Sequence, residues 1–237
     1  MSSLSRSRLV RLLSDLASVE GEDPRQDVAE RLSHWLDAVS AVRLDGALQS
    51  IQAYARQKGV ASLGCAGPLP VAEWEQALQR MRLGLMQGFG AAALNLAALP
   101  HEGEPDYGPY YQRYLELQRQ MEAKVAALRA QLRQALSKGS VAQRQLAALD
   151  AVMEQMLGPR QQKLWTSVPV YLERRFEQLR QTRQAGGDVG GDSSSSPPAW
   201  QAQFGRQWQE LLQAELQARL EPVMGLLDAA RQEVRIQ

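Results

Sequence analysis

The chain has 237 residues, and its 27 lysine and arginine residues almost balance its 26 aspartate and glutamate residues, for a net charge of +1. This balance excludes capture of nucleic acid or of an anionic membrane by the charge of the whole protein. A single cysteine and two histidines exclude a disulfide framework and a zinc site built from several cysteines. Good helix formers are abundant and isoleucine occurs only twice, which predicts an all-α fold.

Residues 1–57 are predicted to form the N-terminal helices. Apolar residues at helical spacing predict helices over residues 6–19, from 23 or 24 to about 42, and from 45 to about 57. Glycines and prolines predict a loop over residues 58–70. Charges interrupt the first apolar run, so we expect no signal peptide.

An apolar helix rich in small residues is predicted over residues 71–99. Its uncharged part, Leu83–Leu99, has 17 residues and includes Gln87 and Asn95. That length is at the lower limit for spanning a membrane, and the two polar residues and three glycines weaken the segment further. We therefore expect no transmembrane segment and, by default, a cytoplasmic location. Gly84 and Gly88 form a GxxxG pattern, which in a soluble chain usually marks close helix packing.

Residues 107–183 are predicted to form a long central antiparallel hairpin, followed by a further helix, within a helical bundle. From Tyr110 to Ser137, apolar residues recur in steps of three and four that repeat every eleven residues, a pattern of straight or slightly right-handed coiled-coil pairing. These residues are Tyr114, Leu117, Met121, Val125, Leu128, Leu132 and Leu136. Gly139 as C-cap and Ser140 as N-cap should make the tight break between the two hairpin helices.

Prolines are expected to divide the remainder of this region. Gly158 and Pro159 predict the end of one helix and the start of the next, and Pro169 predicts a kink or a restart with Ser167 as the cap. Glycines, serines and prolines over residues 184–199 predict a flexible linker.

Residues 200–237 are predicted to form a C-terminal amphipathic helix that Pro222 kinks or restarts. Its apolar residues are spaced by four and comprise Trp200, Phe204, Trp208, Leu212, Leu216 and Leu220. We expect this helix to pack on the same core, because such helices usually do. Exchange between protomers and docking on a partner are the alternatives, so Trp200, Phe204, Trp208 and Leu212 are the candidate partner-binding residues.

No residue pattern predicts a catalytic, cofactor-binding or metal site. Cys65 lies in a predicted loop, and only His34 or His101 could serve as its base, so an inert cysteine is expected. The acidic loop at His101 lacks the ligand spacing of known metal sites. We therefore expect neither enzymatic activity nor a cofactor.

Arginines supply the candidate contacts to an anion. Arg6, Arg8 and Arg11 precede the first acidic residue of the chain, and Arg174 and Arg175 belong to its densest basic group. Because acidic residues interleave with the second group, a salt-bridged surface is favoured there over a nucleic-acid interface.

Several short segments together carry a family resemblance: Arg25–Gln26, Ala29–Leu32, Trp35–Leu36, Leu149–Val152, Val168–Pro169, Leu172–Phe176, Glu215–Leu216, Arg219–Leu220, Pro222–Val223 and Leu226–Leu227. Their order resembles a proteobacterial family that is a domain of unknown function. Genes of that family often lie near genes for a MotA/ExbB-like membrane protein and an OmpA/MotB-type peptidoglycan-binding protein. The resemblance therefore implies a cytoplasmic accessory of an envelope-associated assembly.

Three functional hypotheses follow. The leading one is a non-enzymatic helical interaction or scaffold protein that binds a protein partner or itself, because apolar helix stripes occur without a catalytic set. The second is a nucleic-acid-binding regulator that uses the arginines, and the third is an enzyme with an unrecognised site around Cys65 and His101.

Overall fold

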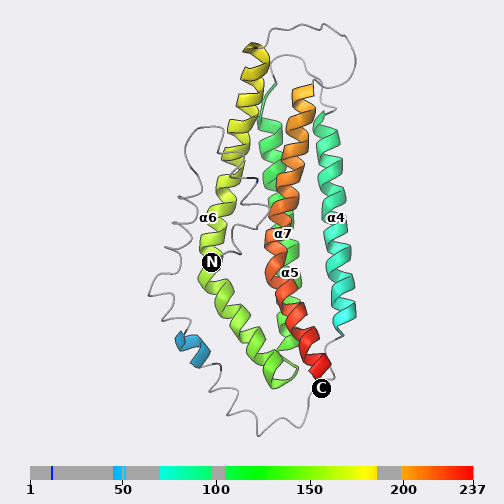
Figure 1. Ribbon diagram of the computed structural model, residues 1–237, viewed down its shortest axis with the longest axis vertical. Helices are drawn as coiled ribbons and strands as arrows, with labels where there is room; N and C mark the ends of the chain where they lie inside the picture. Colours follow the sequence, from blue (N-terminus) through cyan, green and yellow to red (C-terminus); the bar gives the residue numbers. More distant parts are fainter. Residues whose placement is uncertain are drawn as a thin grey trace. The chain divides into compact units, whose positions relative to one another are not determined.

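The computed structural model describes residues 70–97, 105–185 and 199–236, together with residues 12, 45–49 and 51. Its long helices are α4 (Val71–Ala97), α5 (Gly108–Leu136), α6 (Val141–Ala185) and α7 (Ala199–Ile236) (Figure 1). Residues 45–49 and 51 are also helical, and these described ranges contain no β-strand. The prediction of an all-α fold is therefore confirmed. Apart from the residues just named, the predicted N-terminal helices and the 58–70 loop lie outside the described residues.

The starts of α4 and α5 follow local backbone chemistry. α4 begins after Pro70, whose carbonyl accepts a hydrogen bond from the Glu73 N–H at 3.0 Å. α5 begins at Gly108, two residues earlier than the sequence pattern predicts. Pro109 fits the first turn of a helix because its missing N–H would have no partner there. The Asp106 carboxylate accepts the Gly108 N–H at 3.1 Å and so satisfies a free donor at this end.

The break between α5 and α6 has the predicted capping group. The Ser140 hydroxyl accepts the backbone N–H of Gln143 at 3.1 Å, which is the N-cap bond of α6. On the other side of the break, the Arg144 guanidinium donates to the Gly139 carbonyl at 3.0 Å. Four residues, 137–140, therefore suffice to end one helix and start the next.

The predicted helix end at Gly158 with a new start at Pro159 is wrong, and neither Pro169 nor Pro222 starts a new helix. The kinks predicted at Pro169 and Pro222 stay predictions. α6 continues through Gly158, Pro159 and Pro169, and α7 continues through Pro222. Proline has a helical φ and removes one backbone hydrogen bond, so contacts made by the flanking turns can hold such a helix together. The predicted linker is also too long, because α6 includes residues 184–185 and α7 includes residue 199. Residues 186–198 lie outside the described part of the chain.

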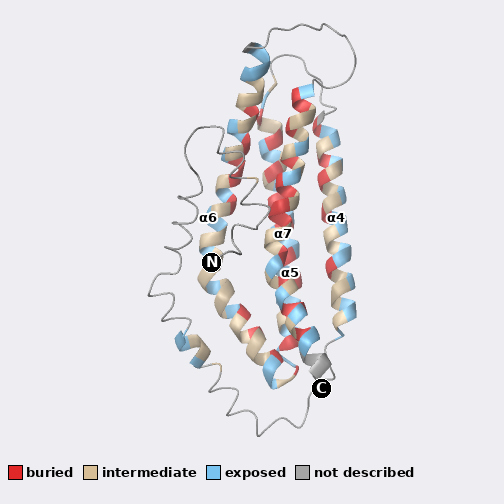
Figure 2. Cartoon of the chain, in the orientation of Figure 1, coloured by how far each residue is buried: buried red, intermediate tan, exposed pale blue. Residues whose placement is uncertain are grey.

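The chain forms two compact units. Among the described residues, unit 1 comprises residues 12, 82–97, 105–122, 165–185 and 199–218, and unit 2 comprises residues 45–49, 51, 70–81, 123–164 and 219–236. The seven apolar residues of the eleven-residue repeat in α5 are all buried, as their spacing predicts. Unit 2 buries aliphatic residues from its helical segments: Leu78, Val125, Leu128, Leu132, Leu136, Ala147, Leu220, Val223, Leu226, Leu227 and Ala230. Figure 2 shows buried residues recurring along each of the long helices.

Among the described residues, no helix combines the length and the apolar character that crossing a membrane requires.

Candidate functional site

Unit 1 is built around a cluster of aromatic rings. Phe204 in α7 is fully buried and lies 5.0 Å from Tyr110 and 5.1 Å from Phe176, measured between ring centroids, in edge-to-face arrangements. Trp208 lies 6.0 Å from Tyr114, and Trp200 lies 5.3 Å from Phe176. Edge-to-face pairs at such distances are the favoured geometry for aromatic side chains. The cluster thus joins α5, α6 and α7 within unit 1.

The four candidate partner-binding residues belong to this core. Trp200 is 8% exposed, and Phe204, Trp208 and Leu212 are completely buried. In this structure their side chains therefore contact their own chain and are not displayed to a partner. The stripe that suggested a binding surface is the face through which α7 packs in unit 1.

Tyr107 ties the start of α5 to α6. Its hydroxyl donates to the Pro169 carbonyl at 2.8 Å, and its ring lies 5.7 Å from that of Phe176. Burial raises the pKa of the Tyr107 phenol, and the nearby Glu173 charge adds to that effect. The phenol therefore stays protonated and keeps its donor at any physiological pH.

Pro169 leaves an acceptor in α6 that a side chain from α5 satisfies. Because proline has no N–H, the Trp165 carbonyl lacks the donor four residues later that a regular helix would provide. The Gln118 amide donates to this carbonyl at 3.1 Å. Gln118 is 8% exposed, so this bond lies away from solvent. A side chain of α5 thus compensates for the proline within α6.

The same amide binds a buried carboxylate. Gln118 Nε2 lies 3.0 Å from each carboxylate oxygen of Glu215, and the Tyr114 hydroxyl donates to Glu215 Oε2 at 2.7 Å. Glu215 and Tyr114 are both fully buried. Buried polar groups are retained when their hydrogen bonds are satisfied, and these bonds link α5, α6 and α7 in unit 1. We call Tyr114, Gln118, Glu215 and the Trp165 carbonyl the buried polar network.

Replacing Gln118 by leucine is expected to lower the free energy of unfolding by about 2 kcal/mol, since it leaves the Trp165 carbonyl and Glu215 short of a donor. In a Pro169→Ala background, residue 169 regains an N–H for that carbonyl. The cost of Gln118→Leu should then fall by about 1 kcal/mol, measured as the coupling energy of a double-mutant cycle in urea. Strict additivity would contradict the compensation of Pro169 by Gln118.

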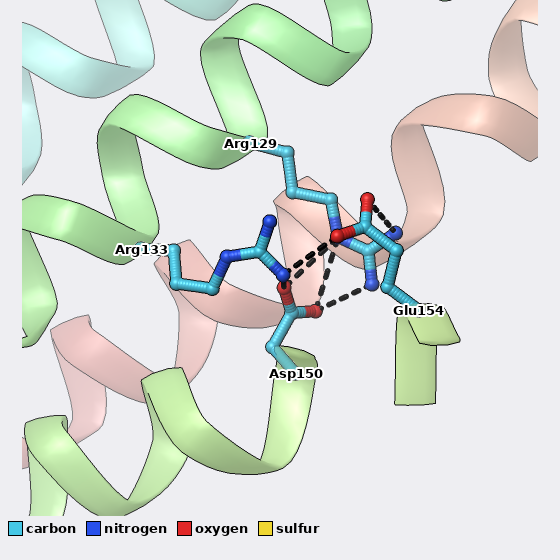
Figure 3. Close-up of polar contacts among 4 residues, drawn as sticks. All are labelled: Arg129, Arg133, Asp150 and Glu154. Atoms are coloured by element: carbon cyan, nitrogen blue, oxygen red, sulfur yellow. Dashed lines mark hydrogen bonds and ion pairs between the residues drawn. The ribbon is translucent and has the colours of Figure 1, made fainter. Parts of the chain in front are cut away.

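Unit 2 contains a cluster of charged residues between α5 and α6. The Arg129 guanidinium contacts Asp150 through two nitrogens at 2.7 and 2.9 Å, and Arg133 contacts Glu154 at 2.7 Å (Figure 3). Longer contacts connect Arg129 to Glu154 at 3.4 Å and Arg133 to Asp150 at 3.5 Å. Two arginines thus balance two carboxylates, and the side chain of Asp150 is only 8% exposed. We call these four residues the charge cluster.

Asp150→Ala should lower the free energy of unfolding by about 2 kcal/mol, because it leaves Arg129 partly buried without its principal partner. Chemical denaturation measures this change. The matched control is Glu116→Ala, which removes an exposed pair with Arg113, and a change below about 0.5 kcal/mol is expected there. Equal effects of the two substitutions would contradict the special role of the charge cluster.

The candidate arginines do not form a common site in the described residues. Arg175 donates to Gln207 of α7 at 3.0 Å and to Gln178 at 3.4 Å, so its guanidinium contributes to packing within unit 1. Arg174 is exposed on α6. Arg180 pairs with Glu177 at 2.8 Å, and hydrogen bonds from Arg180 and Gln181 lower the pKa of Glu177. Arg6, Arg8 and Arg11 lie outside the described residues.

Of the residues considered for catalysis or metal binding, only Asp106 is described by the structure, and its carboxylate accepts the Gly108 N–H at the start of α5. Cys65, His34, His101, Glu102 and Glu104 all lie outside the described ranges, so their roles stay as predicted from the sequence. Within those ranges, no group of three or more histidine, cysteine, aspartate and glutamate residues could hold a metal ion.

A shallow open cavity of about 350 Å³ lies between α4 and α5 in unit 1. Its lining combines small and apolar groups with polar ones: Ala92, Asn95, Leu96, Pro109, Gln112, Arg113 and Glu116. Arg113 and Glu116 form an ion pair with each other at 2.7 Å. Since their charges offset one another, the cavity has no unbalanced charge that would select an ionic ligand.

The exposed face of α4 in unit 1 differs from an ordinary helix surface. Leu94 is 73% exposed and Leu83 is 56% exposed, while the buried face is formed by Leu85, Phe89, Ala92 and Leu96. No charged residue occurs from Leu83 to Ala97. Surface helices normally direct charged and polar residues away from the core, so this face has the character of a contact surface. We call Leu83, Gly84, Gln87, Gly88, Ala91 and Leu94 the neutral face of α4.

The comparison with protein families identifies the chain. A family model described as a protein of unknown function, DUF3348, matches residues 1–232. The chain belongs to the DUF3348 family. The match confirms the resemblance to a family of unknown function that the scattered segments indicated. For this DUF3348 member, no curated protein and no solved structure matches.

The buried polar network and the charge cluster were missed by sequence reasoning. Arg129 and Arg133 are four residues apart, as are Asp150 and Glu154, and the two pairs flank the break at residues 137–140. Opposite charges with matched spacing across a short turn were therefore a usable signal. No comparable signal exists for Glu215, whose partners lie about 100 residues away.

Proposed function

We propose that this DUF3348 protein is a helical interaction or scaffold protein without catalytic activity of its own. The observation that carries the proposal is the neutral face of α4, where Leu83 and Leu94 are exposed on a stretch without charge. Exposed apolar patches on a helix are typical of sites that bind another protein.

The helices next to α4 support the proposal that the bundle displays this helix to a partner. We propose that α5 and α6 form the central antiparallel hairpin of a helical bundle, on which α4 is displayed. Two observations support this arrangement. The break between the two helices has only four residues, 137–140. The charge cluster connects α5, before the break, to α6, after it. The described polar clusters serve helix–helix contacts, so rigid packing rather than an open polar site is their common feature.

The family resemblance suggests where in the cell the proposed interaction takes place. Genes of the family that the segments resemble often lie near genes for envelope proteins, and we propose on that ground that this protein is a cytoplasmic accessory of an envelope-associated assembly. An uncharged helix face suits a protein partner better than a nucleic acid, whose phosphates require lysine or arginine contacts.

Site-specific photo-cross-linking in living cells tests the proposal. A photoreactive phenylalanine analogue at Leu94 should give cross-linked protein products, identified by mass spectrometry. The matched control is the same analogue at Val170, an apolar residue of α6 that is 48% exposed and adjoins a charged surface. Absence of products from Leu94, Leu83 and Gln87 alike would overturn the proposal.

A further inference from the structure

We draw no further inference here: the strongest candidate, the exposed neutral face of α4 around Leu83 and Leu94, belongs to the surface already proposed to bind a partner, and nothing in the structure shows what covers it.

Discussion

Replacing Phe204 by alanine is expected to lower the free energy of unfolding by about 4 kcal/mol, near the upper range for removal of a buried aromatic side chain. Phe204 is completely buried, and its ring contacts Tyr107, Tyr110 and Phe176. The substitution removes apolar contacts and leaves a cavity among rings that cannot easily move together. The melting temperature should fall by roughly 10 °C for a chain of this size. Circular dichroism and tryptophan fluorescence, which reports on the adjacent Trp200 and Trp208, measure the change.

Two further variants separate packing from other effects. Phe204→Leu keeps most of the buried apolar surface and should cost about 1–2 kcal/mol. Tyr111→Ala removes an aromatic ring that is 43% exposed at the margin of the same cluster, and a loss below about 1 kcal/mol is expected. An unchanged melting temperature for Phe204→Ala would show that α7 does not pack in unit 1 in solution. In that case its aromatic stripe would again be the candidate partner-binding surface.

The helices were predictable where one local signal dominated. The eleven-residue apolar repeat of α5 identifies its buried face, and Ser140 marks the start of α6, because periodicity and capping depend on neighbouring residues alone. α7 is similar, since its stripe from Trp200 to Leu220 is buried as a continuous face.

Predictions failed where distant contacts decide the outcome. The sequence predicts a kink or a restart at Pro169, yet α6 does not restart there. Gln118 of α5 donates to the Trp165 carbonyl, whose usual helical donor would be the N–H of residue 169. Local propensity describes the cost of a proline, while the compensation depends on a residue 51 positions earlier in the chain. The burial of Glu215 could not be predicted for the same reason. In the sequence, a glutamate beside a leucine stripe resembles an ordinary surface residue.

The neutral face of α4 is a different case, because the sequence drew attention to this segment without indicating which of its residues are exposed. The absence of charge from Leu83 to Leu99 raised the question of a membrane span, and Gly84 with Gly88 indicated close helix packing. Only the structure shows that Leu83 and Leu94 are exposed while Leu85 and Phe89 are buried. Charged residues at helical spacing normally show which side of a helix is exposed. This segment has none, so its sequence alone does not show which residues face the solvent.

Replacing Glu215 by alanine is expected to lower the free energy of unfolding by about 3 kcal/mol. The carboxylate is fully buried and accepts hydrogen bonds from Tyr114 at 2.7 Å and from Gln118 at 3.0 Å. Its removal takes away the carboxylate acceptor of two buried donors, and each such lost bond costs about 1–3 kcal/mol. Denaturation in urea measures the loss, and the melting temperature should fall in parallel.

Glu215→Gln keeps the shape of the side chain and one acceptor oxygen, so it should lower the free energy of unfolding by only about 1 kcal/mol. Glu210→Ala is the surface control, because Glu210 is exposed on α7, and it should change that free energy by less than about 0.5 kcal/mol. Combining Glu215→Ala with Tyr114→Phe removes the donor together with its carboxylate acceptor. The double variant should therefore be more stable than the sum of the two single losses predicts, with a coupling energy of about 1 kcal/mol. Additive losses would mean that Tyr114 and Glu215 contribute through packing alone, and the hydrogen bond between them would then not be what holds α5 to α7.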